Sequence, residues 1–236
     1  MIRPLSPADL AAAGERDLLL RQLAARHATD RPVTACGEAV ALWHLFGDDP
    51  ELVITGPPTD ATVLARAAFA DPAVHGVSLP VPAVPLLAGL GLAEPMGWAF
   101  RWTTEAPSLP TEGVAWAGDE DEVRDLLAVA FPDASMPVGH PDVRRWAGLR
   151  RDGRLVAVAA DATIVPGLGF LASIATHPDL RGTGAGAAVT AWSTAELVRE
   201  EGACGLWHMA DNLVAAALYT RLGYRDEHPM AVLSRE

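Results

Sequence analysis

Three glycines at alternate positions precede an alanine-rich segment in "IATHPDLRGTGAGAAV", residues 174–189. Arg181 stands directly before these glycines, which are Gly182, Gly184 and Gly186. A glycine-rich turn that enters a helix leaves several backbone N–H groups free, and together with the helix dipole these groups attract an anion. We therefore expect the turn to bind a phosphate group, in preference to being an ordinary strand-to-helix connection.

Two other phosphate-binding motifs fit this turn less well. A Walker loop requires a following Gly-Lys-Ser/Thr, which the sequence lacks. Gly182, Gly184 and Ala187 do satisfy the dinucleotide-binding pattern G-x-G-x-x-G/A. However, "HPDLR" is too long for a tight strand-to-helix corner, and Glu200 and Glu201 precede the next expected strand instead of ending one. This context argues against a dinucleotide site.

The elements around the turn alternate between strands and helices. Asp119 and Glu122 have the spacing of a helix capping box, and Asp152-Gly153 between two apolar-alternating runs predicts a hairpin. We expect a strand at 169–176, a helix after the glycines, a strand near 204–210, a helix at about 213–222 and a last strand near "PMAVLS". The apolar face of the helix after the glycines is predicted to comprise Ala188, Ala191, Trp192, Ala195 and Val198. This order predicts an α/β fold with a mixed, mostly antiparallel sheet flanked by helices.

Two motifs in this half of the chain resemble those of the GNAT superfamily of acyl-CoA-dependent N-acyltransferases. "RGTGAG" has the form of the family signature Arg/Gln-x-x-Gly-x-Gly/Ala. "NLVAAALYTRLGY" resembles the family's Asn-x-x-Ala-x-x-Leu-Tyr-x-x-x-Gly-aromatic segment. The residues in register are Asn212, Ala215, Leu218, Tyr219, Gly223 and Tyr224. The resemblance covers residues 113–236.

The resemblance implies how acetyl-CoA, the expected co-substrate, would bind. In the family the diphosphate of CoA lies on the amides of the glycine turn, which here comprises Arg181, Gly182, Thr183, Gly184, Ala185 and Gly186. The pantetheine arm pairs with the preceding strand, here Ile174, Ala175 and Thr176. Asn212 is a further cofactor contact, a helix N-cap, or both. An amine attacks the thioester directly, and a backbone N–H of the strand stabilises the oxyanion.

The resemblance also implies a general acid, because Tyr219 matches the tyrosine that protonates the departing thiolate. Packing in the core is the alternative role for this side chain. The base departs from the family pattern, since Ala172 and Ser173 stand where many members carry a glutamate. His208 on the next strand is one candidate base. The others are Asp133, His140 or an ordered water relay.

We expect residues 1–105 to form a degenerate GNAT-like domain that lines or covers the substrate side. "IRPLSPADLAA" looks like the opening strand and capped helix of such a domain, with Ser6 as N-cap and Asp9 as its partner. A weak internal repeat aligns "PLLAGLGL" with "ALYTRLGY" and places Leu87 opposite Tyr219. The prolines of "TGPPT" lack N–H groups, so this turn cannot bind a diphosphate in the same way.

The two domains are expected to be joined by "TTEAPSLPTEG", residues 103–113, whose prolines and small polar residues interrupt any periodic pattern. The acyl-CoA-binding domain would then span residues 113–236.

Composition limits the other functions of the 236-residue chain. A net charge of −12 argues against nucleic-acid binding. No stretch approaches the ~18 apolar residues of a membrane span, and the N-terminus lacks the pattern of a signal peptide, so we expect a cytoplasmic protein. Cys36 and Cys204 lack metal-ligand spacing and predict neither a metal site nor a disulfide.

The sequence thus predicts an N-acyltransferase that moves an acyl group, with acetyl-CoA as the expected donor, to a primary amine. The amine belongs to a small molecule, protein or peptide that the sequence does not name, because residues 131–143 carry no motif. The alternative is a non-catalytic acyl-CoA sensor or interaction module that lost its base. Tyr219 favours the enzyme, and the missing glutamate favours the sensor. The oligomeric state, including a homodimer, stays open.

Overall fold

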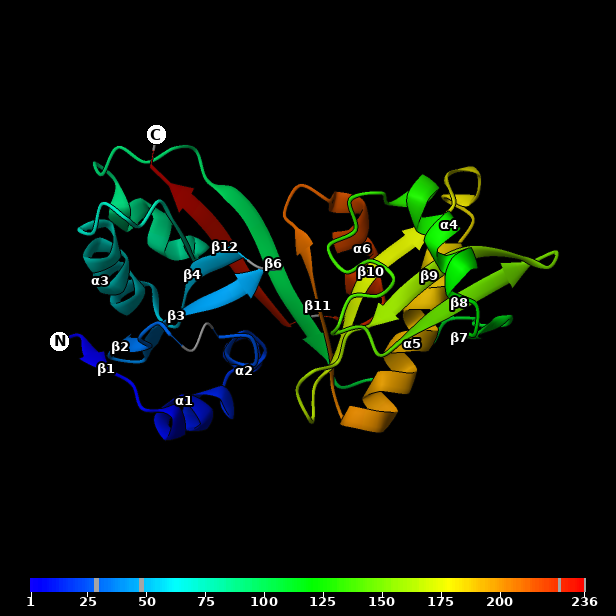
Figure 1. Cartoon of the computed structure of the whole chain (residues 1–236), viewed down its shortest axis with the longest axis horizontal. Coiled ribbons are helices and arrows are strands. Elements are labelled where there is room, and N and C mark those ends of the chain that lie inside the picture. The colour runs from blue at the N-terminus through cyan, green and yellow to red at the C-terminus, as the bar shows by residue number, and fades with distance from the viewer. Residues whose placement is uncertain (28–29, 47–48, 225, 236) are drawn as a thin grey trace. The chain divides into compact units, whose positions relative to one another are not determined.

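The computed structural model describes residues 1–27, 30–46, 49–224 and 226–235. The chain divides into two compact units (Figure 1). The first comprises Met1–Phe100, His208–Leu213 and Glu227–Glu236, and the second comprises Arg101–Trp207 and Val214–Asp226. The expected domains 1–105 and 113–236 differ from these units mainly in the C-terminal strand, which belongs to the first unit. That the first unit is a degenerate GNAT-like domain stays a prediction.

The second unit is a mixed, mostly antiparallel sheet with helices, in the order that the sequence predicts. Its elements are β7 (Val114–Ala117), α4 (Glu120–Ala130), β8 (Arg145–Arg151), β9 (Arg154–Asp161), β10 (Gly169–Thr176), η2 (Pro178–Leu180), α5 (Ala185–Glu201), β11 (Cys204–Met209) and α6 (Leu213–Arg221). The strand order is β11-β10-β9-β8-β7. The β10–β11 pair is parallel, whereas β9–β10, β8–β9 and β7–β8 are antiparallel. The predicted fold class is confirmed.

Local sequence signals explain where two of these elements begin and turn. The carboxylate of Asp119, the N-cap of α4, accepts hydrogen bonds from the N–H groups of Asp121 (2.9 Å) and Glu122 (3.3 Å). The β8–β9 hairpin turns at Asp152 (φ 50°) and Gly153 (φ 77°). Positive φ at both central residues is the conformation that an Asp-Gly hairpin favours. The predicted helix start and hairpin are therefore both confirmed.

The helix α5 packs on the sheet of the second unit, on the side opposite α4 (Figure 1). Of the predicted apolar face, Ala191 is buried, and Ala188, Trp192 and Val198 pack against the hydrophobic core. The buried face is wider than predicted, because it also includes three fully buried hydroxyl side chains, those of Thr190, Ser193 and Thr194. Each hydroxyl donates a hydrogen bond to the carbonyl four residues earlier in the helix. Burial costs little for a hydroxyl that is bonded in this way, so polar positions can face the core.

The first unit contains a second sheet with helices. Its elements are β1 (Arg3–Pro4), α1 (Pro7–Gly14), α2 (Leu18–Ala24), β2 (Thr34–Cys36), β3 (Ala39–Phe46), β4 (Asp49–Thr55), α3 (Pro58–Phe69), β5 (Gly76–Pro80), η1 (Val81–Leu87), β6 (Met96–Thr103), which ends in the second unit, and β12 (Asp226–Ser234). The strand order is β1-β2-β3-β4-β5-β12-β6. The β4–β5 pair is parallel, and β12 pairs with β5 antiparallel.

The two halves of the sequence repeat one succession of elements, although their residues differ. The series β2, β3, β4, α3, β5, η1, β6 matches β8, β9, β10, α5, β11, α6, β12, with the parallel strands at β4–β5 and β10–β11. This repetition supports the prediction of a second GNAT-like half. The capped first helix is also present, since Ser6 Oγ accepts from the N–H of Asp9 at 3.1 Å.

Three further observations concern possible sites elsewhere in the described residues. None of their helices is long and apolar enough to cross a membrane. They contain no group of three or more His, Cys, Asp or Glu side chains that could hold a metal ion. Cys36 and Cys204 are both buried free thiols.

Candidate functional site

The glycine turn before α5 is held open by two left-handed residues. Gly182 has φ 78° and Gly184, the N-cap of α5, has φ 86°. Residues with side chains rarely adopt these angles, which explains the glycines. A Cβ built at either position would meet no atom within 4 Å, so the surface over the turn is unobstructed by the protein.

The N-terminus of α5 also has no side-chain cap. By contrast, α1 and α4 begin at Ser6 and Asp119, whose side chains accept helix N–H groups. The first N–H groups of a helix lack partners within the helix, and in a helix of 17 residues they carry the positive end of its dipole. An uncapped end beneath open space can therefore accept an anionic group.

The third glycine is needed for packing, because Gly186 lies against the end of β10. A Cβ at Gly186 would lie 2.7 Å from Oγ1 of Thr176, which is closer than non-bonded atoms approach. The glycine therefore lets the first turn of α5 sit directly on the strand that precedes the turn. In this way the structure brings Thr176 and the predicted turn together.

Arg181 fixes the turn from its other side. Its guanidinium donates a hydrogen bond to the carbonyl of Ala130, the last residue of α4, at 3.0 Å. The last carbonyls of a helix lack partners within it, so this bond satisfies one of them. The side chain of Arg181 thus anchors the turn, and its backbone N–H donates to the carbonyl of Pro178 at 3.2 Å, so Arg181 adds no free N–H group to the proposed anion site.

The strand β10 is irregular at Ser173, which with Ala172 stands where many GNAT proteins carry a glutamate. Ser173 has φ 46°, the pairing with β9 shifts register between Ala172 and Ala175, and its hydroxyl donates to the carbonyl of Met136 at 2.8 Å. Bulges of this kind bend a strand and often adjoin active sites. The hydroxyl is occupied by this bond, so Ser173 does not supply a base.

The same irregularity separates the end of β10 from β11. In the described residues the parallel pairing comprises Gly169 with Cys204 and Phe170 with Gly205. On its other edge β10 continues to pair with β9 at Ala175 and Thr176. Residues 174–176 therefore lie beyond the pairing with β11 and directly before the glycine turn. This is the position at which an extended ligand could add to the strand edge.

Tyr219 lies in the core of the second unit. It is 7% exposed and belongs to an apolar cluster that includes Leu171 of β10 and Leu222, with Ile174 packed against it. Burial raises the pKa of Tyr219 to about 12. The phenol is therefore protonated at neutral pH, as a proton or hydrogen-bond donor requires. The structure brings the predicted acid and the predicted pantetheine strand into one cluster.

A second tyrosine next to Tyr219 has a structural role. The rings of Tyr219 and Tyr224 lie 5.9 Å apart. The hydroxyl of Tyr224 bonds with Oγ1 of Thr194 (2.7 Å) and donates to Sγ of Cys204 (3.1 Å). All three groups are buried, so this network ties α5 and β11 to the end of α6 and provides a matched comparison for Tyr219.

His208 and Asn212 belong to the first unit. The ring of His208 is 9% exposed, and its Nδ1 lies 2.8 Å from the carbonyl of Met209. A carbonyl only accepts, so Nδ1 carries the proton and Nε2 of the neutral ring holds the lone pair that a base needs. Asn212 directly precedes α6, at the N-cap position. Both assignments stay predictions.

The other candidate bases occupy the segment between α4 and β8. Asp133 is exposed. His140 is partly buried, and its Nδ1 accepts a hydrogen bond from the N–H of Asp142 at 3.2 Å. Neither observation distinguishes them from His208 as the base.

Sequence reasoning missed two arginines at this site. Arg151 donates to both oxygens of Thr183, at 2.9 Å to Oγ1 and 3.3 Å to the carbonyl. Arg154 lies 2.7 Å from Nε2 of His177. The available signal was the pair of arginines that flanks the predicted Asp152-Gly153 hairpin.

Comparisons with known proteins agree with the fold and with part of the sequence. Residues 147–231, which contain both the glycine turn and Tyr219, match a family described as FR47-like protein. No curated protein matches the chain by sequence.

Solved structures resemble nearly the whole chain. A GCN5-related N-acetyltransferase from Kribbella flavida is 23% identical, with 95% of each chain covered and a TM-score of 0.60. One from Sphaerobacter thermophilus is 17% identical, with 100% of this chain and 95% of that chain covered and a TM-score of 0.60. A GNAT-family acetyltransferase from Colwellia psychrerythraea is 11% identical, with coverage of 99% and 98% and a TM-score of 0.58. The chain thus has the fold of GNAT acetyltransferases.

Proposed function

We propose that this chain belongs to the GNAT superfamily and is an N-acetyltransferase that moves the acetyl group of acetyl-CoA to a primary amine. The observation that carries the proposal is the uncapped, open glycine turn at residues 181–186, directly after a strand end that extends beyond its parallel pairing. A diphosphate is proposed to bind there because the first N–H groups of α5 have no side-chain cap and no partner within the helix. Pantetheine, which carries two amides, fits an extended strand edge.

The reaction is the direct attack of the amine nitrogen on the thioester carbonyl carbon. A C–N bond forms, the carbonyl oxygen becomes an oxyanion, and collapse of this intermediate breaks the C–S bond. A backbone N–H of β10 is proposed to stabilise the oxyanion. The amine loses one proton to a base, for which His208 is the proposed group, and the departing CoA thiolate gains one.

Tyr219 is proposed to act on the departing thiolate. Its pKa of about 12 lies above the value of about 8.5 for a free thiol. The phenol therefore stabilises the thiolate chiefly by donating a hydrogen bond, and the proton lost by the amine completes the balance. Removing one such donor from a site that excludes water typically slows turnover by about 10²–10³.

A non-catalytic acyl-CoA sensor is the second candidate. It is favoured by Ala172 and by Ser173, whose hydroxyl is engaged with Met136, because neither supplies the usual carboxylate base. A sensor, however, would not need Tyr219, which is buried and in register with the family's general acid. Steady release of free CoA in the presence of an amine distinguishes the two functions.

Binding is tested by a charge change in the open turn. Asp and Asn tolerate a left-handed φ better than other residues with side chains, so Gly182→Asp and Gly182→Asn form a matched pair. The first adds a negative charge where the diphosphate is proposed, and the second adds the same shape without charge. We expect calorimetry to show acetyl-CoA affinity lowered at least tenfold more by Asp than by Asn. Equal affinity of both variants would contradict this site.

Turnover is tested by screening amines and measuring thiol release. The sequence contains no lysine, so acetylation of the enzyme's own side-chain amines cannot mimic a protein substrate. Small amines, amino-terminal peptides and lysine peptides can therefore be compared in one assay. If acetyl-CoA binds but no class of amine is acetylated, the result would favour the sensor.

A further inference from the structure

Two arginines of the β8–β9 hairpin reach the glycine turn at its two ends. Arg151 donates hydrogen bonds to Thr183, within the turn. The guanidinium of Arg154 lies beside His177, where the turn begins. Arg151 thus extends from the tip of the hairpin onto the segment proposed to hold the diphosphate, and Arg154 extends to His177, four positions before that segment.

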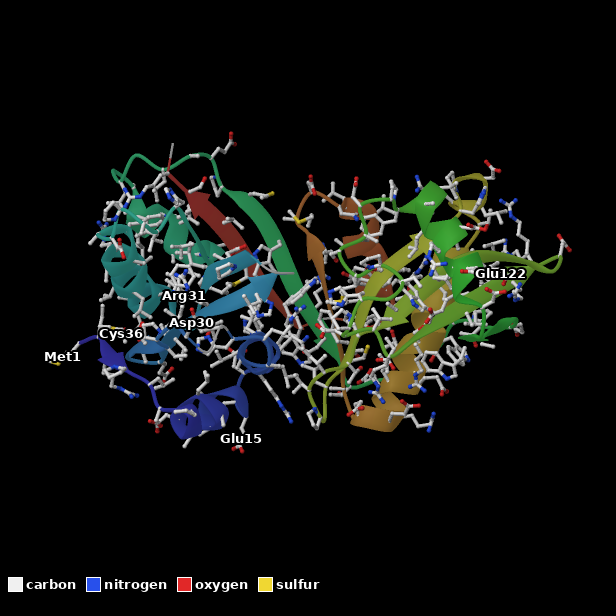
Figure 2. All side chains as sticks on the ribbon, viewed as in Figure 1. Met1, Glu15, Asp30, Arg31, Cys36 and Glu122 are labelled. Carbon is white, nitrogen blue, oxygen red and sulfur yellow. The ribbon has the colours of Figure 1, made fainter. Side chains whose placement is uncertain are left out.

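These two arginines form a like-charged pair that the fold does not explain. Arg151 and Arg154 are directly opposite each other in the hairpin register, and like charges in such positions repel. The neighbouring Arg150 is neutralised by Glu122 of α4, whose side chain Figure 2 labels. In the described part of the chain neither Arg151 nor Arg154 forms an ion pair with a carboxylate. A bound anion would relieve their repulsion.

The pair is accessible to a ligand. Both arginines are exposed. Arg154 also lines a hollow of about 360 Å³ together with Leu155, His177 and four residues of α4, of which Glu122 and Asp125 are acidic. An arginine has five N–H donors, so Arg151 can keep its two bonds to Thr183 and still donate to a ligand.

We propose that Arg151 and Arg154 bind the 3′-phosphate of CoA. This inference rests on the proposed function. The 3′-phosphate is separated from the diphosphate by one ribose, so it must lie beside a turn that holds the diphosphate. Arginine matches phosphate geometry through paired N–H donors. In a chain of net charge −12, two unpaired cations at this point also offset the general repulsion of a polyanionic substrate.

The test compares acetyl-CoA with 3′-dephospho-acetyl-CoA by calorimetry on the full chain. We expect the unmodified protein to bind acetyl-CoA about tenfold more tightly, the scale of one hydrogen bond to a charged group. Arg151→Gln and Arg154→Gln should each remove most of this preference by weakening acetyl-CoA alone. Arg199→Gln is the control, because Arg199 is an exposed arginine near the C-terminal end of α5, where it pairs with Glu196.

The outcomes separate this inference from the proposed function. Equal weakening of both ligands in the hairpin variants would show that the arginines only support the turn, and would overturn the inference. Equal affinities of the unmodified protein for the two ligands would also overturn it, while leaving the proposed function intact. If neither ligand binds the unmodified protein, the proposed function itself fails and the inference fails with it.

Discussion

Gly186 stands so close to Thr176 that a Cβ on the glycine would lie 2.7 Å from the threonine Oγ1. The contact joins the first turn of α5 to the end of β10. It also gives this glycine a role different from that of Gly182 and Gly184, whose positive φ angles require glycine while the space around them is open.

Gly186→Ala is therefore expected to destabilise the fold. In a helix alanine is ordinarily favoured over glycine by about 1 kcal/mol, but here the added methyl group overpacks the contact at a cost of roughly 1–3 kcal/mol. Urea unfolding measures the change in the free energy of unfolding. The cost should shrink when Gly186→Ala is made in a Thr176→Ala background, because that change removes Oγ1. An unchanged cost would mean that the clash is elsewhere.

Tyr219→Phe is expected to lower kcat on the order of a hundredfold while the Kd for acetyl-CoA stays nearly unchanged, because only the hydroxyl that stabilises the thiolate is lost. Since the pKa of Tyr219 is about 12, the phenol stays protonated up to about pH 11. The kcat of the unmodified enzyme should therefore show no alkaline loss due to this group between pH 7 and 10. Normal turnover together with a lowered Tm would instead support a packing role.

Tyr224→Phe is the matched control for that experiment. Its hydroxyl bonds with Thr194 and Cys204 inside the core, so its loss should cost about 1 kcal/mol of stability. We expect kcat to change less than threefold, which is far below the effect at Tyr219. A large loss of kcat in this variant would show that the tyrosine pair acts as a unit.

Much of the second unit could be predicted because its signals are local. Asp152-Gly153 specifies its hairpin, Asp119 specifies the start of α4, and the strand at 169–176 has the bounds that its apolar run indicates. The glycine turn could be recognised because backbone conformation, rather than a distant partner, demands Gly182 and Gly184.

The features of the fold and the site that could not be predicted depend on long-range contacts, which residue spacing along the chain does not encode. The buried face of α5 is wider than the predicted one, because Thr190 and Thr194 satisfy their hydroxyls within the helix and can face the core. The pairing of β12 with β5 joins the end of the chain to the first unit, and no local pattern near residue 230 specifies that partner. The proposed role of Arg151 and Arg154 could not be predicted, because only the folded chain places these side chains beside Thr183 and His177.

Stability is expected to fall at alkaline pH because two buried acids resist ionisation. Burial raises the pKa of Cys204 from 9.0 to about 12, and that of Tyr219 from 10.0 to about 12. Above pH 9 the unfolded chain loses these protons before the folded chain does, so the stability present below pH 9 is lost as pH rises towards 12. Urea unfolding from pH 7 to 10.5 should show a slope approaching about 1.4 kcal/mol per pH unit for each group that ionises only in the unfolded chain.

The reactivity of the Cys204 thiol tests its burial independently of the unfolding experiment. Cys204 is fully buried, and a thiol of such high pKa supplies little thiolate, so at pH 8 it should not react with an aromatic disulfide reagent until the protein unfolds. Cys36→Ser leaves Cys204 as the one cysteine of the chain and makes the measurement unambiguous. Rapid reaction of the folded Cys36→Ser protein would contradict the burial of Cys204.

Each chain is expected to bind a single acetyl-CoA, although both units contain a parallel strand–helix–strand segment. In the first unit the corresponding glycine, Gly56, is packed against protein, since a Cβ there would lie 2.7 Å from the Cα of Ala39. Pro57 and Pro58, which follow it at the start of α3, lack N–H groups. The carboxylate of Asp60, in the first turn of α3, also accepts the N–H of Glu38 at 3.2 Å. A negative side chain thus already lies where a second diphosphate would need amides and open space.

Calorimetric titration with acetyl-CoA gives the number of sites directly, and we expect one per chain. Gly182→Asp should remove that site, whereas a matching change in the first unit, Thr59→Asp, should leave both the affinity and the number of sites unaltered. Thr59 suits this comparison because it precedes Asp60 in the first turn of α3, where an added carboxylate is favourable to the helix. A stoichiometry near two, with one site surviving Gly182→Asp, would mean that the first unit binds acyl-CoA despite its prolines and would overturn its interpretation as a degenerate domain.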